Sequence, residues 1–118
     1  MSDPRTRNPG TFEMQVQNGD AGIVLRLSGE FDLACEEAFR DRAAQMPSGA
    51  EVLIDLRELT FIDSTGIRLI VELWQRSNND GIDLAILPGP PDVQRVFQIT
   101  GLDEVLPISN RAADQTEE

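Results

Sequence analysis

The sequence predicts an α/β fold formed by a single domain, with helices packed on a central, mixed but mostly parallel sheet. Three observations support this prediction. Strand-like segments alternate with segments of helical periodicity in the order β-β-α-β-α-β-α-β. Only the first two strands are joined by a short turn, whereas helices separate the later ones. The 118 residues suffice for one domain with a substantial core but not for two.

The first two strands are predicted to form an antiparallel hairpin. Apolar and polar residues alternate over residues 12–17, and the apolar face consists of Phe12, Met14 and Val16. An Asn-Gly-Asp turn follows at residues 18–20. The alternation then resumes at Ile23, Leu25 and Leu27. We expect Gly29 to end the second strand.

The first helix is predicted from apolar residues at helical spacing, namely Cys35, Ala38, Phe39 and Met46. Asp32 stands where an N-cap is expected, and the Pro-Ser-Gly sequence at residues 47–49 stops the helix. The apolar run at residues 52–54 then predicts a strand buried on both faces. We place the centre of the sheet at this strand, over residues 51–56.

A second helix is predicted to begin at residues 63–65. Its apolar stripe follows the i, i+3, i+4, i+7 pattern at Ile67, Ile70, Val71 and Trp74. The Asn-Asn-Asp-Gly sequence at residues 78–81 ends it, and residues 84–87 form the next buried strand. On this helix, Arg68 could pair with Glu72 at i+4.

A third helix begins at the prolines of residues 88–91 and ends before Gly101. Its predicted inward face consists of Val93, Val96, Phe97 and Thr100. A short last strand is expected from Val105, Leu106 and Ile108. We therefore place the folded domain at residues 11–108, between a disordered N-terminal tail at residues 1–10 and a disordered acidic C-terminal tail at residues 109–118.

The residue types present exclude several kinds of chemistry. The absence of His and the presence of one Cys exclude a His general base, a Ser-His-Asp triad, an intramolecular disulfide and a Cys-based zinc site. All ten basic residues are Arg, so the sequence has neither a P-loop lysine nor a Schiff-base lysine. Because no nucleophile–base pair is left, we expect a protein that is not an enzyme and that uses no metal or cofactor.

The charge balance indicates the kind of partner. Ten Arg against 21 Asp and Glu give a formal net charge of −11 at pH 7, which argues against binding to nucleic acid or to an anionic membrane. The N-terminus lacks the pattern of a signal peptide, and no apolar run approaches the length of a membrane span. We therefore expect a soluble protein of the cytoplasm.

Two interpretations apply to Asp63 and Ser64 at the predicted start of the second helix. In the first interpretation, one of the two residues is only an N-cap, whose side chain accepts a hydrogen bond from a backbone N–H of the first turn. Alternatively, Ser64 is an exposed hydroxyl at a helix N-terminus, a place where an added phosphate is tolerated. Periodicity alone leaves both interpretations open.

Three segments together resemble the STAS domain, a family named for sulfate transporters and anti-sigma factor antagonists. The first is Val52-Leu53-Ile54-Asp55-Leu56 followed by Phe61-Ile62-Asp63-Ser64-Thr65-Gly66-Ile67. The second is Gly29-Glu30-Phe31-Asp32, and the third runs from Val93 to Leu102. Their order along the chain matches the family, and the similarity covers about residues 12–108.

The resemblance implies a free-standing bacterial anti-sigma factor antagonist. In such proteins the serine that matches Ser64 is phosphorylated by a partner that is both an anti-sigma factor and a serine kinase. The unphosphorylated antagonist binds that partner and frees the sigma factor, and a serine phosphatase restores it. By the same resemblance, Asp32, Asp63, Thr65 and Gly66 flank the phosphoacceptor and contribute to the partner surface.

Two other functions remain open for a STAS domain. The protein could be a subunit of a membrane transport complex, in which case Ser64 is only a cap or contact residue. It could also be a nucleotide-sensing module, because some STAS domains are reported to bind nucleotides. Phosphorylation of Ser64 would distinguish the first alternative, and calorimetry with GTP and ATP would distinguish the second.

Overall fold

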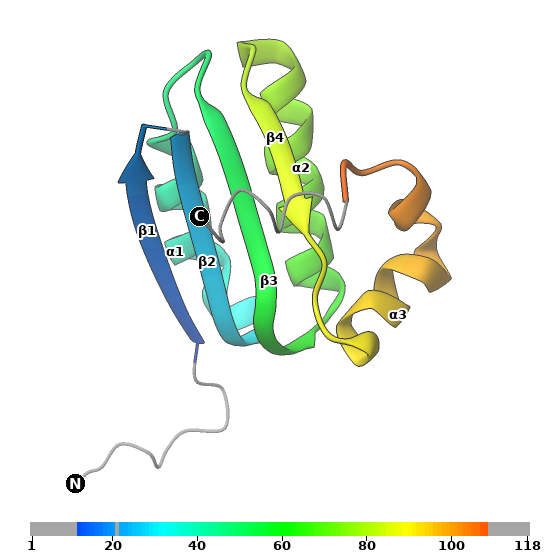
Figure 1. Cartoon of the computed structure of the whole chain (residues 1–118). Coiled ribbons are helices and arrows are strands. Elements are labelled where there is room, and N and C mark those ends of the chain that lie inside the picture. Colours follow the sequence, from blue (N-terminus) through cyan, green and yellow to red (C-terminus); the bar gives the residue numbers. More distant parts are fainter. Residues whose placement is uncertain (1–11, 21, 109–118) are drawn as a thin grey trace, which may run out of the picture.

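The computed structural model describes residues 12–20 and 22–108 (Figure 1). The predicted tails, at residues 1–10 and 109–118, lie outside the described residues. The strands are β1 (Phe12–Gly19), β2 (Gly22–Phe31), β3 (Glu51–Ile62) and β4 (Asp83–Leu87). The α-helices are α1 (Glu36–Ala44), α2 (Ser64–Asp80) and α3 (Pro91–Thr100), and the short 3-10 helices are η1 (Leu33–Cys35) and η2 (Leu102–Glu104).

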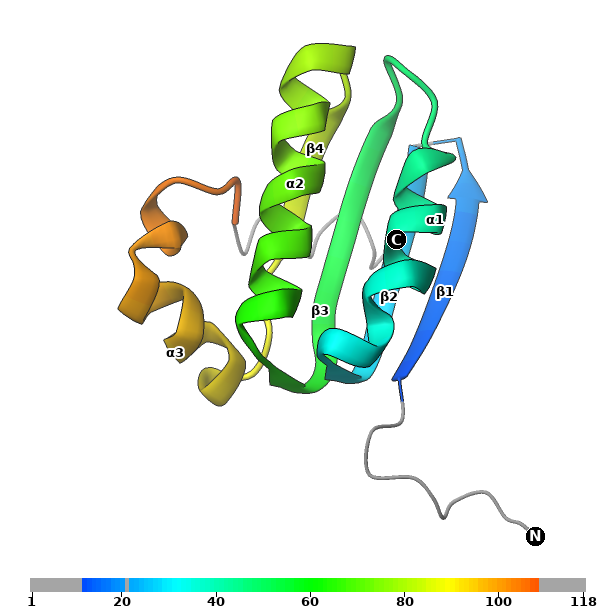
Figure 2. The same ribbon diagram turned by 180° about the vertical axis from the view of Figure 1, so that it is seen from behind.

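The four strands form one mixed sheet in the order β1-β2-β3-β4. β1 pairs with β2 in antiparallel fashion, and β2, β3 and β4 run parallel to one another. Because the strand order never reverses, right-handed crossovers place α1 and α2 on the same face of the sheet. Figures 1 and 2 show both helices on that face. The predicted α/β fold with a mixed, mostly parallel sheet is therefore confirmed.

The main core fills the space between the sheet and these two helices. Its fully buried side chains include Leu25, Leu27, Phe31, Phe39, Ile54, Leu69, Ile70 and Ile86. On the opposite face, which no described helix covers (Figure 1), Leu53 and Leu87 form a smaller cluster with Val24 and Ala85. Successive side chains of a strand point to opposite faces, so the run at residues 52–54 contributes to both clusters, as its pattern predicts.

Two strands are longer than predicted. Gly29 does not end β2; it lies with φ at +89° at an irregularity in the register, and the strand continues to Phe31. β3 is also not confined to residues 51–56 but extends to Ile62, because Glu30 pairs with Phe61 and Phe31 with Ile62. These extensions carry both strands to the start of the helices that follow them.

Three smaller predictions are wrong. The last strand is reduced to a single bridge in which Ile108 pairs with Ile86, because Val105 lies in a helical turn and Pro107 has no N–H to donate. Ala38 is exposed on α1 and Thr100 is exposed on α3, so neither faces the core. The Thr100 hydroxyl donates instead to the backbone oxygens of the preceding turn.

Candidate functional site

Two aspartates occupy equivalent positions at one edge of the sheet. Phe31 ends β2 and pairs with Ile62, which ends β3. Asp32 and Asp63 directly follow these paired residues, so both lie where parallel strands pass into helices. The backbone N–H of Asp63 also donates to the carbonyl oxygen of Phe31 at 3.3 Å, which holds the two strand ends together.

Both aspartates cap the helical segment that follows. The Asp32 side chain accepts a hydrogen bond from the Ala34 N–H at 3.1 Å, at the start of η1. The Asp63 side chain accepts one from the Gly66 N–H at 3.0 Å, at the start of α2. Each carboxylate thus satisfies one backbone donor that the helix cannot satisfy itself, and it places negative charge where the helix dipole favours it.

Ser64 is the first residue of α2, and its side chain is exposed to solvent. Its hydroxyl makes no hydrogen bond with any residue of the described chain. Thr65 is half-buried and Gly66 is buried. The hydroxyl of Ser64 is therefore more accessible to another protein than that of Thr65.

Gly66, in the first turn of α2, lies close to the last residues of β2 and β3. A Cβ atom at this position would stand 2.6 Å from the carbonyl oxygen of Phe31 and 2.8 Å from Cγ1 of Ile62. The first turn of α2 can therefore pack against the two strand ends only if this residue has no side chain. The sequence motif placed Gly66 at the site, and this close approach is the physical reason for it.

Cys35 lies beneath the site rather than on its surface. Its thiol is buried and donates to the carbonyl oxygen of Glu30 at 3.3 Å. Burial raises the pKa of the Cys35 thiol, and the nearby carboxylates of Asp32 and Asp63 raise it further. The thiol is therefore kept protonated, as expected of a packed cysteine rather than a reactive one.

Four charged residues form a network between α1 and α2, next to the site. Arg40 of α1 donates to both carboxylate oxygens of Glu72 on α2, at 3.1 and 2.9 Å, and it also pairs with Glu36. Arg68 of α2 contacts the same two glutamates over longer distances, 3.3 Å to Glu72 and 3.7 Å to Glu36. The hydrogen bonds from Arg40 and, more weakly, from Arg68 lower the pKa of Glu72, so it stays ionised. We refer to these four residues as the interhelical network.

Two apolar side chains at this edge of the sheet are exposed to solvent. Leu33 follows Asp32 and is 66% exposed, and Phe61 precedes Ile62 and is 47% exposed. Neither residue was predicted from the sequence to belong to the site. Leu33 does not fit the periodicity of the first helix, and that mismatch was the available signal. Exposed apolar residues next to a functional group are typical of a surface that binds another protein.

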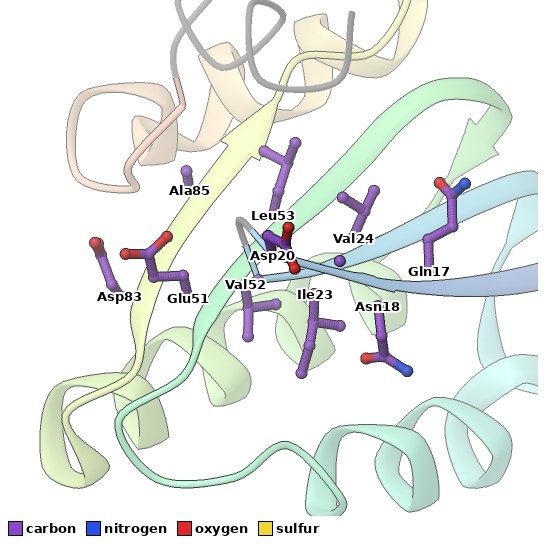
Figure 3. A pocket seen from close by; sticks show the side chains of 12 residues that line it. Gln17, Asn18, Asp20, Ile23, Val24, Glu51, Val52, Leu53, Asp83 and Ala85 are labelled. Carbon is purple, nitrogen blue, oxygen red and sulfur yellow. The ribbon is translucent and has the colours of Figure 1, made fainter. Parts of the chain in front are cut away.

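A pocket of about 310 Å³ lies at the other end of the sheet, between the β1–β2 turn and the starts of β3 and β4. Figure 3 shows the carboxylates of Asp20, Glu51 and Asp83 around it. About 35 Å of β3 separates its first residue, Glu51, from Ser64. The pocket is therefore distinct from the site at the start of α2, and its acidic lining repels phosphate groups.

The family model of the STAS domain matches residues 11–115 of the chain. The chain belongs to the STAS domain family. The resemblance seen in the sequence is thereby confirmed, and the helix start formed by Asp63, Ser64, Thr65 and Gly66 lies within the matched region.

Relatives within the family are named as anti-sigma factor antagonists. An anti-sigma F factor antagonist of Paenibacillus polymyxa is 27% identical over 100 residues, which cover 82% of this chain and 86% of that protein. An anti-sigma-B factor antagonist of Listeria monocytogenes is 30% identical over 90 residues, which cover 75% of this chain and 79% of that protein.

Solved structures of such proteins share the fold. An anti-sigma factor antagonist from Mycobacterium paratuberculosis superimposes with a TM-score of 0.71 and 25% identity, covering 86% of this chain and 87% of that one. The antagonist SpoIIAA in its unphosphorylated form gives a TM-score of 0.67 at 24% identity, covering 88% and 96%. In the described part of this chain, no helix has the length and apolar character that crossing a membrane requires.

Proposed function

We propose that this protein is an anti-sigma factor antagonist that works as a phosphorylation-controlled partner switch in the cytoplasm. With Ser64 unphosphorylated, it binds an anti-sigma factor that is also a serine kinase, and the sigma factor is freed for transcription. Phosphorylation of Ser64 ends that binding, and a serine phosphatase restores it. The antagonist itself catalyses no reaction in this scheme.

The observation that carries the proposal is the free, exposed hydroxyl of Ser64 beside a cap that another residue already provides. Because Asp63 accepts the hydrogen bond from the Gly66 N–H, capping does not require the Ser64 side chain. A helix N-terminus also tolerates an added anion, since its dipole and its free N–H groups favour negative charge. The names of the relatives support the same function.

The energetics favour a switch that acts on binding rather than on folding. A phosphoryl group adds about −1.5 to −2 charge at pH 7. The helix dipole stabilises one exposed charge by about 0.3–1 kcal/mol, and repulsion from the Asp63 carboxylate opposes this, so the net effect on folding is small. Burying an unpaired charge in an interface costs several kcal/mol, and each 1.4 kcal/mol is about tenfold in affinity. A loss of about a hundredfold in affinity follows.

The surface around Ser64 suits a protein partner. Leu33 and Phe61 supply exposed apolar area at the same edge of the sheet. The Asp32 and Asp63 carboxylates lie nearby, at the ends of the paired strands. Apolar contacts supply affinity, and acidic groups attract a basic patch on the partner. A phosphate placed among these groups would be repelled by the carboxylates and desolvated by the apolar contacts.

The test is to mix the protein with a kinase-type anti-sigma factor encoded in the same genome. Affinity is measured by calorimetry before and after incubation with ATP, and phosphate incorporation is measured by mass spectrometry. We expect one phosphate per chain and an affinity about a hundredfold lower afterwards. Ser64→Ala should take up no phosphate and bind constitutively. Ser64→Asp should bind poorly and yet melt within a few degrees of the original protein.

Thr65→Val is the matched control, because it removes the neighbouring hydroxyl and keeps the shape of the side chain. This variant should still accept one phosphate. The proposal fails if Ser64→Ala takes up phosphate stoichiometrically, or if the phosphorylated protein binds as tightly as before. A subunit of a transport complex would bind no anti-sigma factor and would not respond to ATP in this experiment.

A nucleotide-sensing function receives no support from the pocket at the other end of the sheet. Its carboxylates, those of Asp20, Glu51 and Asp83, would face the phosphates of GTP or ATP. Repulsion between like charges opposes such binding. Calorimetry with either nucleotide should therefore give no heat of binding.

A further inference from the structure

We propose that Arg68 is the cation that holds the phosphate of phosphorylated Ser64, by exchanging its glutamate partners for the phosphate. This inference rests on the proposed function, because it concerns the same modified serine. It assigns the phosphate an intramolecular partner and makes the interhelical network (Glu36, Arg40, Arg68 and Glu72) part of the switch.

The spacing on α2 brings the two residues together. Ser64, Arg68 and Glu72 are four residues apart in succession, so they form one row on the surface of the helix. Residues at this spacing have Cβ atoms about 5–6 Å apart, and long helical side chains lean toward the helix N-terminus. Ser64 therefore lies on the side toward which the Arg68 side chain naturally leans.

Arg68 is the loosely held member of the network. Its side chain is 49% exposed, and its contacts with Glu72 and Glu36 measure 3.3 and 3.7 Å. Arg40 instead donates two hydrogen bonds to Glu72, at 3.1 and 2.9 Å, and it also pairs with Glu36. If the Arg68 side chain turned away from the network, both glutamates would still be paired with Arg40. The loss of the Arg68 contacts would therefore cost little electrostatic free energy.

A phosphate is a stronger partner for this arginine than either glutamate is. It carries about −1.5 to −2 charge and three acceptor oxygens, against a single charge on a carboxylate that is shared with Arg40. An arginine can bind a phosphate with two parallel hydrogen bonds. The carboxylate of Asp63, which directly precedes Ser64, and that of Asp32 at the adjacent strand end repel the phosphate. The guanidinium of Arg68 adds a full positive charge to the weaker attraction of the backbone N–H groups at the helix start.

The test uses protein with phosphoserine incorporated directly at position 64, so that no kinase is needed. The second pKa of the phosphate is followed by phosphorus NMR, because a paired cation favours the dianion and lowers that pKa. We expect Arg68→Ala to raise this pKa by about half a unit. Arg68→Lys should give a value between those of the original protein and Arg68→Ala, because it keeps the charge but not the paired donors.

Arg40→Ala is the matched control, since it removes the other cation of the network and lies on α1 rather than in the row of Ser64. Without Arg40, Arg68 is the remaining partner of both glutamates in the network, so the pKa of the phosphate should rise, but by less than in Arg68→Ala. The proposal is overturned if Arg68→Ala has no effect, or if Arg40→Ala has an equal one. Because the phosphate is built in, such a result would leave the proposed kinase and partner untouched, and a failure of those would not affect this measurement.

Discussion

At the start of α2, two adjacent residues that are both good N-caps have different roles. Asp63 has an extended backbone, with φ at −116° and ψ at −171°, and its side chain accepts from the Gly66 N–H. Ser64 is already helical and exposed. Composition cannot separate them, because Asp and Ser cap helices about equally well. The end of β3 determines which of the two residues is the cap. Because β3 ends at Ile62, Asp63 lies between the strand and the helix, and Ser64 is the first helical residue.

Replacement of Gly66 by Ala should destabilise the protein. The added Cβ would meet the Phe31 carbonyl oxygen at 2.6 Å, and backbone there cannot move without disturbing the pairing of β2 with β3. We expect the free energy of unfolding to fall by about 2–3 kcal/mol, as measured by urea denaturation. Binding to the partner should weaken as well, because the same turn positions Ser64.

Gly19→Ala provides the comparison for this change. Nothing lies within 4 Å of a Cβ built at Gly19, so the same substitution meets open space there. Its free energy of unfolding should stay within about 0.5 kcal/mol of the original. Equal losses at the two positions would mean that glycine flexibility, rather than the contact with Phe31, explains the effect at Gly66.

At the scale of the elements, a buried carboxylate joins β2 to β3 on the face opposite α1 and α2. Asp55 of β3 is 1% exposed and accepts a hydrogen bond from Arg26 of β2 at 3.1 Å. Arg57 donates to it from the same strand. Burial alone would raise the pKa of Asp55, but the hydrogen bonds from Arg57 and Arg26 outweigh burial and leave this pKa below its usual value of 3.8.

The lowered pKa of Asp55 has a consequence for stability against pH. A carboxylate whose pKa is lower in the folded state contributes stability above its unfolded pKa, and that contribution is lost as the pH falls through the folded pKa. Asp55→Asn should therefore lower the free energy of unfolding at pH 7, because the charged hydrogen bonds from Arg26 and Arg57 are lost. The loss should be only about 1–2 kcal/mol, because both arginines are partly exposed and can be hydrated after the change.

Urea denaturation of both proteins between pH 7 and pH 2 would check this prediction. The difference between the original protein and Asp55→Asn should shrink as the pH falls below about 4. A difference that stays constant over this range would mean that shape, and not charge, accounts for the effect of the substitution.

Local pattern predicted the elements well and their ends less well. The helix starts at Asp32 and Asp63 were visible, because capping depends on a few adjacent residues. The second half of β3 was not visible, since its exposed polar residues show no apolar run and its strand conformation depends on pairing with β2. The i, i+4 spacing of Arg68 and Glu72 predicted their ion pair, which is confirmed, and the mismatch of Leu33 with the helical periodicity was a local hint of its exposure. The contacts of the interhelical network that join α1 to α2 depend on tertiary packing, so no local signal predicted them.

At the scale of the whole molecule, the formal net charge of −11 should guide the approach of a partner. An acidic protein is attracted to a basic patch over distances of about a Debye length, which is about 10 Å at 0.1 M salt and about 3 Å at 1 M. Like charges also keep separate copies of the chain apart. Charge should therefore set the rate of association more than the rate of dissociation.

Association with the anti-sigma partner should slow as salt rises, by about tenfold between low and high ionic strength. Stopped-flow measurements on Glu37→Gln and Glu51→Gln locate the charges responsible. Both residues are exposed, but Glu37 lies on the first turn of α1, whereas Glu51 lines the pocket at the other end of the sheet. Attraction weakens with distance, so Glu37→Gln should reduce the salt dependence more than Glu51→Gln does. An association rate indifferent to salt would mean that the charge serves solubility alone, and equal effects of the two variants would place the partner elsewhere than at Ser64.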